Sequence, residues 1–542
     1  MTQAGPLTLA PATPLAPASG WLPRIGTLAL LVGVGLLVLP PLLYLAAAAV
    51  KAGELGAVTI GSLAGLAFTT LSLATLATIW AMLLALPLAW LVIRTDLPFR
   101  TLCRWLAVIP LAIPSYVGAM SYIALLGPVG SVNTWLSALL GTPQQWVNIY
   151  GFWGGVFVLG LFTYPYIFLL VSAALEATNP AVEETARSLG DSPLGVFRRV
   201  TLPMLRPSML AGGLLAFLYA LSDFGSPSLL RVQVFTTAIY HQLNTRFDQA
   251  AAAMLSFVLV LITIAVLIGQ HMLLHRRSYV TITGTARLAR PLHLGRWRWP
   301  AGLLAGMVLS LSVFIPLGVL LAQTGSLSHF LEVVREQGDY IKNSLLIAGL
   351  AATLAAILGL LIAFTARHTP PRTGALLSGT IQIGYAIPGT VLGLSLILLY
   401  NTYIPWLYGT VGVLVVAYLI RFLTQSVQGV DAALTGINPH LEEAARSLAA
   451  FPWRVLRRVL APLVRPTLFA VWALVFISAM KELDATLLLR PAGFDTLPVR
   501  VYIHTVEAEY ARAAVMALLL IAFTALPWLV VTRLREKKLI WR

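Results

Sequence analysis

Residues 179–208 read NPAVEETARSLGDSPLGVFRRVTLPMLRPS, and residues 438–467 read NPHLEEAARSLAAFPWRVLRRVLAPLVRPT. The two stretches align without a gap, with Asn179 on Asn438, and this register is called the loop offset. Upstream, LAIPSYVG from Leu111 pairs with YAIPGTVL from Tyr385, and this register is called the kink offset. The kink offset is the larger, which predicts an insertion in the first copy, within the uncharged stretch 127–150. The chain therefore consists of two similar halves.

The composition places both halves in a membrane. Of 542 residues, 58% are hydrophobic and only 10% are charged, whereas soluble domains carry about 25% charged residues. Apolar runs of about 20 residues can cross a bilayer, and in lipid such runs fold as helices. The runs lie near residues 25–48, 63–93, 105–126, 150–176, 208–230, 250–275, 300–323, 343–366, 375–400, 409–432, 464–482 and 511–532.

These runs predict an all-α polytopic protein of about 12 transmembrane helices, six in each half. An even number gives both halves the same orientation, so we expect a pseudo-two-fold axis along the membrane normal with a pathway near it. The expected divisions are a disordered cytoplasmic tail (1–24), a first half (25–275) with a polar loop (179–207), a basic linker (276–299), a second half (300–532) with its loop (438–466), and a basic tail (533–542).

The net charge of +16 is distributed as in an inner-membrane protein. With the N-terminus inside, basic residues gather on the cytoplasmic segments, including the linker and the C-terminal tail, as the positive-inside rule requires. This bias predicts a multi-pass protein of the cytoplasmic membrane with both termini cytoplasmic, and it argues against nucleic acid as a partner. The single cysteine, Cys103, excludes an internal disulfide and a cysteine-rich metal site.

The repeated segment has the signals of a short helix followed by a second one. Asn179 before Pro180 is typical of a helix N-cap with proline in the first turn, and Gly190 can end that helix. Ser192 before Pro193 predicts the next start. We expect Pro203 and Pro207 to break the chain before the following span, so that both short helices lie across the membrane face.

The spacing Glu-x-Ala-x-x-x-Gly, formed by Glu184, Ala186 and Gly190, resembles the signature loop of binding-protein-dependent ABC importer permeases. The resemblance covers essentially the whole chain and implies a type I importer fold, in which each loop forms a coupling helix seated in a cleft of an ATPase subunit. The coupling residues that it implies are Glu183, Glu184, Ala186, Arg187, Gly190, Glu442, Glu443, Ala445, Arg446 and Ala449. Ala449 stands where the pattern has glycine, so the two docking sites are expected to differ.

The energy source must lie on another chain. A P-loop requires Gly-Lys-Ser/Thr, and none of the lysines here follows a glycine. The resemblance implies two ATPase subunits, which use ATP and Mg²⁺, on the cytoplasmic face and a substrate-binding protein on the outer face. We expect no bound cofactor and no catalytic residue on this chain, which is not itself an enzyme.

Charged residues inside spans are candidates for function, because each costs about 2.5–3.5 kcal/mol at the centre of a helix on insertion scales. At the loop offset, Asp223 aligns with Glu482 and Gly225 aligns with Asp484. We expect the acids to line the pathway near its outer mouth. The alternative is a structural ion pair of Lys481 with Glu482 or Asp484.

The flanking sequences suggest a substrate. SDFG with FTTAIY, and KELDATLLLRPAGFDTLPVRVY, resemble the fused permeases for ferric iron. Fe(III) is a hard cation that prefers carboxylate and phenolate oxygen. Tyr116 and Tyr385, beside the two Ile-Pro kinks, are further pathway candidates, although packing alone would also explain them. His241 and His504 show no paired ligand spacing and are expected at the surface, and no tightly bound metal is predicted.

Three alternatives remain open. A permease of the same class could carry thiamine, a polyamine, an oxyanion or a phosphonate, but an anion route should have a cationic lining. A secondary transporter would need no docking loops, which the repeat argues against. A membrane enzyme would need a constellation of catalytic residues, and the sequence shows none.

Overall fold

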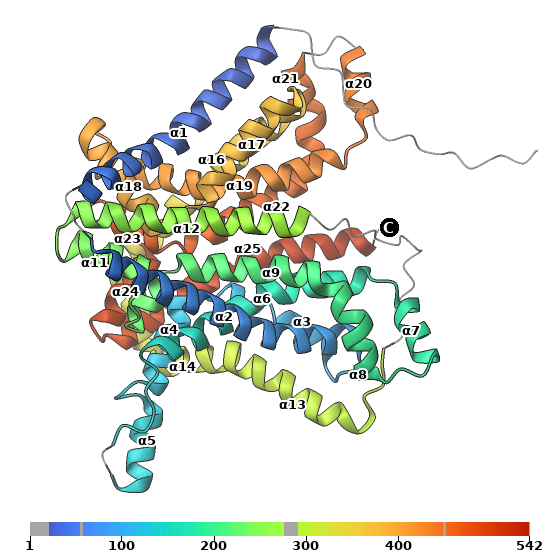
Figure 1. Cartoon of the computed structure of the whole chain (residues 1–542), viewed down its shortest axis with the longest axis vertical. Helices are drawn as coiled ribbons and strands as arrows, with labels where there is room; N and C mark the ends of the chain where they lie inside the picture. The colour runs from blue at the N-terminus through green and yellow to red at the C-terminus, as the bar shows by residue number, and fades with distance from the viewer. Residues whose placement is uncertain (1–20, 55–57, 143, 276–290, 448–450, 541–542) are drawn as a thin grey trace, which may run out of the picture.

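The computed structural model describes residues 21–54, 58–142, 144–275, 291–447 and 451–540. Of the sequence predictions, most of the tail over 1–24, most of the linker over 276–299 and the loop residue Ala449 lie outside them. In Figure 1 the long helices run side by side across the picture. Eleven helices are long and apolar enough to cross a membrane, or twelve if one bent pair counts as a single span. The prediction of two six-helix halves is confirmed.

Six elements of each half correspond. In the first half they are α1 (Trp21–Glu54), α2 (Ile60–Arg94), α3 with η1 and α4 (Arg100–Leu106, Ile109–Leu111, Ser115–Leu126), α6 (Phe152–Ala177), α9 (Leu202–Ser222) and α12 (Gln249–His275). In the second half they are α13 with η4 and α14 (Arg298–Leu309, Ser310–Phe314, Ile315–Gln323), α16 (Gly338–Arg367), α17 with α18 (Pro371–Ala386, Gly389–Tyr403), α19 (Val411–Thr435), α22 (Ala461–Met480) and α25 (Tyr510–Ile540).

Shorter helices connect these spans. Between α6 and α9 lie α7 (Pro180–Ser188), α8 (Pro193–Val196) and the π-turn η2 (Phe197–Thr201), and α20 (Pro439–Ser447), α21 (Pro452–Val455) and η5 (Leu456–Leu460) repeat them. After α9 and α22 come α10 (Gly225–Leu229) with α11 (Phe235–Asn244), and α23 (Asp484–Leu489) with α24 (Leu497–Val506). Three have no counterpart among the described residues: α5 (Ser131–Leu140), η3 (Gly295–Trp297) and α15 (Leu327–Glu336).

The third span of each half, expected over 105–126 and 375–400, is broken at the Ile-Pro kink that the sequence indicated. Proline removes a hydrogen-bond donor and keeps the preceding residue out of the helical region. At Ile387–Pro388 the chain bends by 104° between α17 and α18, and Ile387 is extended (ψ 124°). At Ile113–Pro114, the aligned position, η1 ends and α4 begins.

The prolines after the repeated loop do not break the chain as expected. The helix that starts at Pro193 continues through Pro203 and Pro207 into α9. The missing N–H of Pro203 is accommodated by a π-turn, in which the N–H of Leu202 reaches the carbonyl of Phe197. The second half repeats this π-turn, with Ala461 bonded to Leu456. The segment is therefore the start of a span rather than a separate surface helix.

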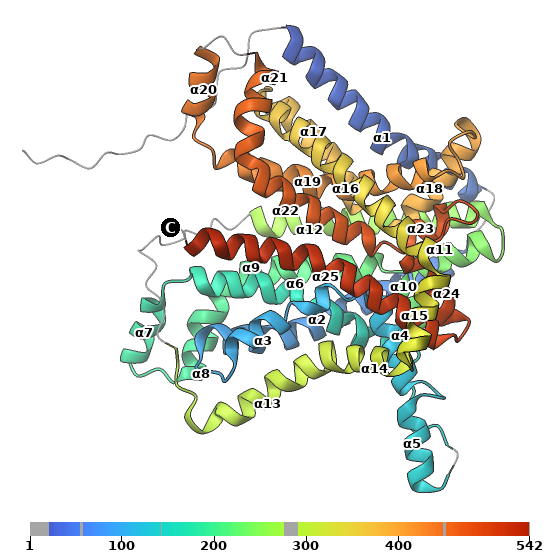
Figure 2. The same ribbon diagram turned by 180° about the vertical axis from the view of Figure 1, so that it is seen from behind.

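The first span of each half packs on the other half. Helix α1 contacts α17 and α18 as well as α12, and α13–α14 contact α2 and α4 as well as α25. In Figures 1 and 2, α1 lies against the second half and α13 against the first. Tyr122 of α4 donates its hydroxyl to the Leu311 carbonyl at 2.6 Å, so hydrogen bonds join these seams as well.

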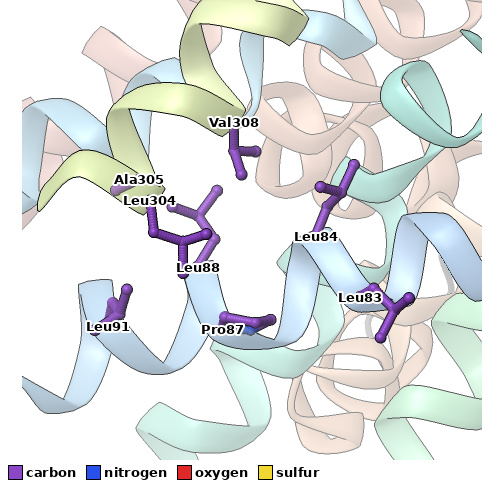
Figure 3. Close-up of a pocket in the computed structure, with 8 residues that line it drawn as sticks. All are labelled: Leu83, Leu84, Pro87, Leu88, Leu91, Leu304, Ala305 and Val308. Carbon is purple, nitrogen blue, oxygen red and sulfur yellow. The ribbon is translucent and has the colours of Figure 1, made fainter. Parts of the chain in front are cut away.

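A small pocket marks the seam between α2 and α13. Its lining side chains are all apolar, and Figure 3 shows them meeting between the two helices: Leu83, Leu84, Pro87, Leu88, Leu91, Leu304, Ala305 and Val308. A cavity without polar groups has nothing to bind a charged or hydrogen-bonding solute. We therefore interpret the pocket as loose packing where α13 of the second half contacts α2 of the first half. The functional site lies elsewhere.

Candidate functional site

Two regions gather the polar residues singled out in the sequence. The first region contains the repeated loops. Helices α7 and α20 lie at the same end of the molecule, whereas α11, α18 and α24 lie at the opposite end (Figures 1 and 2). The predicted caps form: the side chains of Asn179 and Asn438 each accept a backbone N–H at 3.0 Å. Gly190 follows α7 with a φ of 93°, a conformation that favours glycine.

The adjacent glutamates of α7 have different environments. Glu183 is 4% exposed. Its Oε1 lies 3.5 Å from Nε of the equally buried Arg94 and accepts a hydrogen bond from the Thr201 hydroxyl at 3.0 Å. Glu184 is exposed. Glu183 therefore fastens α7 to the end of α2 and to η2, and Glu184 points out of the molecule, where a partner could reach it.

The second half uses a different side chain for the same purpose. Glu442 is 2% exposed and its Oε1 contacts Nε2 of His368, which follows α16. The kink offset aligns His368 with Arg94. Arginine carries a permanent charge, whereas an imidazole is charged only when protonated. Glu443, like Glu184, is exposed, and it contacts His440 within its own helix at 3.1 Å.

The linker adds a second difference between the loops. Its described part pairs with the end of α2: the N–H of Leu292 donates to the Arg94 carbonyl at 2.8 Å, and the N–H of Asp96 donates to the Leu292 carbonyl at 3.1 Å. Hydrogen bonds from Leu294 and His293 lower the pKa of the Asp96 carboxyl. Leu292 also lines a small pocket with Glu183 and Arg187. The linker thus braces the first loop.

Three further loop residues lie on α7 and α20. Ala186, Arg187 and Ala445 are partly buried, and the Arg187 side chain donates to the Glu183 carbonyl at 3.2 Å. The side chain of Arg446 and the whole of Ala449 lie outside the described residues. The structure therefore separates buried anchors, Glu183 and Glu442, from exposed candidates for partner contact.

The second region is a central acidic cluster, made of Asp223, Glu482 and Asp484 with Arg421. Asp223 is 8% exposed; it accepts hydrogen bonds from the Ser115 hydroxyl at 2.8 Å and the Ser226 N–H at 3.0 Å. Glu482 caps the equivalent short helix by accepting the Ala485 N–H at 3.1 Å. Both aligned acids therefore hold the turn that follows a long helix, and they lie within electrostatic range of each other.

The ion pair in this cluster differs from the one considered. Nη1 of Arg421 on α19 lies 2.6 Å from Oε1 of Glu482. Lys481, the partner considered in the alternative interpretation, donates instead to the Leu111 carbonyl in the other half at 2.7 Å. An Lys481 ion pair with Glu482 or Asp484 is therefore wrong for the described structure. Lys481 ties the two halves together at the Ile-Pro kink.

Asp484 and the tyrosines complete the cluster. Asp484 is only partly buried and lies within electrostatic range of Asp223, Glu482 and Arg421. Tyr116 is 2% exposed, and its hydroxyl has no hydrogen-bond partner among the residues that the structure describes. A buried hydroxyl usually has a partner, and this one lies within electrostatic range of Glu482 and Asp484. Tyr385 is 45% exposed and lies in the neighbourhood of Arg421.

One histidine, in α24, is not the surface residue expected. His504 is 4% exposed, and its ring contacts Glu509 at 2.7 Å and Gln337 at 3.1 Å. Burial lowers the pKa of His504, which favours the neutral ring. Glu507 and Glu509 bring their carboxylates near it. Because both ring nitrogens are already engaged, we interpret this group as a structural link between α24 and the loop before α16.

Sequence reasoning missed Arg421, Arg94 and His368. The signal for Arg421 was its charge within a span, and the signal for Arg94 and His368 was their alignment at the kink offset. The carboxylate partner of each of these residues lies far from it in sequence, so the three pairs can be identified only from the fold.

The fold, with two parallel six-helix halves and paired loops at one end, is that of a membrane permease. The chain belongs to the family of binding-protein-dependent transport system inner membrane components, which matches residues 57–279 and again residues 355–539. It is accordingly a multi-pass permease subunit of an ABC-type transport system, and the family resemblance noted in the sequence is confirmed.

Its relatives include ferric transporters. The Fe(3+)-transport system permease protein FbpB 2 of Haemophilus influenzae is 29% identical over 92% of this chain and 96% of the relative. The ferric transport system permease protein FbpB of Actinobacillus pleuropneumoniae is 26% identical over 80% of this chain and 66% of its own. A putative 2-aminoethylphosphonate permease, PhnV of Salmonella typhimurium, is 28% identical over 44% of this chain and 96% of its own.

Proposed function

We propose that this chain is the permease through which an ATP-driven importer brings ferric iron into the cytoplasm. The observation that carries the proposal is the convergence of three carboxylates from both halves near Tyr116, whose buried hydroxyl has no hydrogen-bond partner among the described residues. Carboxylate and phenolate oxygens suit Fe(III). Two relatives named as ferric transport permeases agree with this substrate. The test is uptake of radiolabelled ferric iron by membranes that contain the permease with its binding protein and ATPase.

A phosphonate is the second candidate, because the relative PhnV matches nearly its whole length. An anion would require more cations than acids along its route. The central cluster has three acids and one arginine, and that arginine is already paired with Glu482. The charge of the cluster therefore favours a cation. Uptake of labelled 2-aminoethylphosphonate in the same membranes, with no uptake of iron, would reverse this assignment.

The proposal includes partners and an orientation. Two ATPase subunits, which use ATP and Mg²⁺, would dock on α7 and α20 at the cytoplasmic face. A substrate-binding protein would dock at the opposite end, near α11, α18 and α24. The paired loops at one end and the basic linker and tail support this arrangement. No cofactor is proposed for this chain itself.

We expect Glu184→Lys and Glu443→Lys to weaken recruitment of the ATPase without unfolding the permease. Both side chains are exposed, and a cation near a helix N-terminus opposes the helix dipole. Pull-down of the ATPase measures recruitment, and the double variant should retain less than about a tenth of it, a change of about 1.4 kcal/mol. Because the loops differ, the single variants should differ in severity.

The control for recruitment is Glu332→Lys, an exposed glutamate on α15 at the other end of the molecule. It changes the charge by the same amount and should not alter the pull-down. Full recruitment and transport in the Glu184→Lys, Glu443→Lys double variant would remove the coupling assignment.

Cysteine labelling tests the orientation. In a Cys103→Ala background, a membrane-impermeant thiol reagent should reach Gly190→Cys and Ala449→Cys only from the cytoplasmic side. It should reach Gln144→Cys from the outer side, because the α5 hairpin lies at the other end. Labelling of Gly190 and Ala449 from opposite sides would show that the halves are inverted, and the coupling proposal would then be wrong.

A further inference from the structure

The insertion in the first half forms a hairpin with a defined shape. The described residues of this stretch, 127–142 and 144–150, form α5 and a return segment, and the side chain of Asn133 joins the two. Asn133 is 3% exposed; its amide donates to the carbonyls of Gly127 and Val147, both at 2.7 Å. Its Oδ1 accepts the N–H groups of Trp146 and Val147, both at 2.9 Å. A fully bonded buried amide gives the hairpin a defined shape.

The hairpin leaves large apolar side chains uncovered. At 3.6 residues per turn, Trp135, Leu136, Leu139 and Leu140 share one side of α5, and Thr134 and Ser137 lie on the other. Trp135 is 63% exposed and Leu139 is 64% exposed. Trp146 on the return segment is also exposed. Residues 127–150 contain no charged residue.

The direction of the helix shows what can cover this surface. Residues Ser115–Leu140 are long and apolar enough for a span. In both views, however, α5 runs crosswise to the long helices and extends beyond the side of the bundle, at the end opposite α7 and α20 (Figures 1 and 2). A helix in that position lies parallel to the membrane plane, at the level where the outer ends of the spans meet lipid headgroups.

We propose that the α5 hairpin is an interfacial anchor that inserts Trp135, Leu139 and Trp146 into the outer leaflet of the membrane. Tryptophan is enriched at membrane interfaces, and amphipathic helices lie there with the apolar face in the acyl boundary. A docking surface for a soluble protein would have a polar, charged rim, which this stretch lacks. Because the hairpin is uncharged, its anchoring depends on apolar burial and not on anionic lipid.

Fluorescence quenching tests the anchor. The full-length permease with Cys103→Ala and Leu139→Cys is labelled with the fluorophore NBD and placed in phosphatidylcholine nanodiscs. Brominated acyl chains should quench Leu139→Cys at least about twofold more than the matched Thr134→Cys on the polar side, and aqueous iodide should show the reverse order. Trp135→Cys is a second apolar position if labelling at 139 impairs folding. The difference should persist when anionic lipid is added.

Two outcomes would overturn the proposal. Equal access of iodide to both positions without any partner would show that the apolar side faces water. Loss of iodide access at position 139 only after the substrate-binding protein is added would make the hairpin a docking surface for that protein instead.

Discussion

Asp484→Asn is expected to lower ferric iron uptake about tenfold or more while the amount of permease in the membrane stays normal. Asn keeps the size of the side chain and removes one charge from a partly exposed position in the central acidic cluster. Two unit charges 4 Å apart interact by about 4 kcal/mol near a protein surface, and a tenfold change requires only about 1.4 kcal/mol. Uptake of radiolabelled iron and quantitative immunoblotting, measured on the same membranes, give the two values.

Glu482→Gln is the control that separates charge from architecture. It removes the same charge, but it leaves the mostly buried Arg421 without its carboxylate partner, and such a loss is strongly destabilising. We therefore expect less protein with Glu482→Gln and normal protein with Asp484→Asn. Full iron uptake by Asp484→Asn would remove this residue from the pathway. No iron uptake by the wild-type protein, assayed with its partners, would remove iron as the substrate.

Arg94→Leu should destabilise the permease and uncouple the first ATPase site. The substitution leaves the Glu183 carboxylate buried with only the Thr201 hydroxyl as a side-chain partner among the described residues. Removing one member of a buried ion pair costs about 3–5 kcal/mol. A lower Tm of the purified protein and reduced binding-protein-stimulated ATPase activity of the assembled complex are the two measurements.

The double variant Arg94→Leu, Glu183→Leu tests whether the loss comes from the uncompensated charge. Replacing both members by apolar residues of similar size is often close to neutral, so its Tm should recover towards that of the wild type. The exposed Glu184→Leu is the matched control and should leave Tm unchanged. If Arg94→Leu alone has the Tm and the binding-protein-stimulated ATPase activity of the wild-type protein, the ion pair does not hold α7 in place.

Much of the fold follows from the repeated sequence. The loop offset correctly pairs α7 with α20 and Asp223 with Glu482, and the kink offset pairs the two Ile-Pro kinks. The helix caps at Asn179 and Asn438 were also predictable, because capping is local chemistry. The position of the insertion, between α4 and α6, agrees with the uncharged stretch 127–150.

The errors arise where neighbours in sequence point in different directions. Adjacent residues on a helix do not share a face, which separates the buried Glu183 from the exposed Glu184. For the same reason the alternative ion pair of Lys481 with its sequence neighbours does not form, because the cation that reaches Glu482 is Arg421 on another helix. Pro203 was expected to end a helix, but a π-turn can absorb a missing N–H without breaking the chain.

Because the first span of each half packs on the other half, each first span and its packing partners are synthesised at different times. Helix α1 leaves the ribosome first, but α17 and α18, against which it packs, are made only after the whole first half and the linker. At about 5–20 residues per second, α1 waits roughly 15–60 s in lipid for them. Helices α2 and α4 likewise remain uncovered until α13 and α14 arrive. A ribosome that stops in the linker would therefore release a first half in which α1 lacks α17 and α18, and in which α2 and α4 lack α13 and α14. We expect membrane quality control to recognise these uncovered helix surfaces.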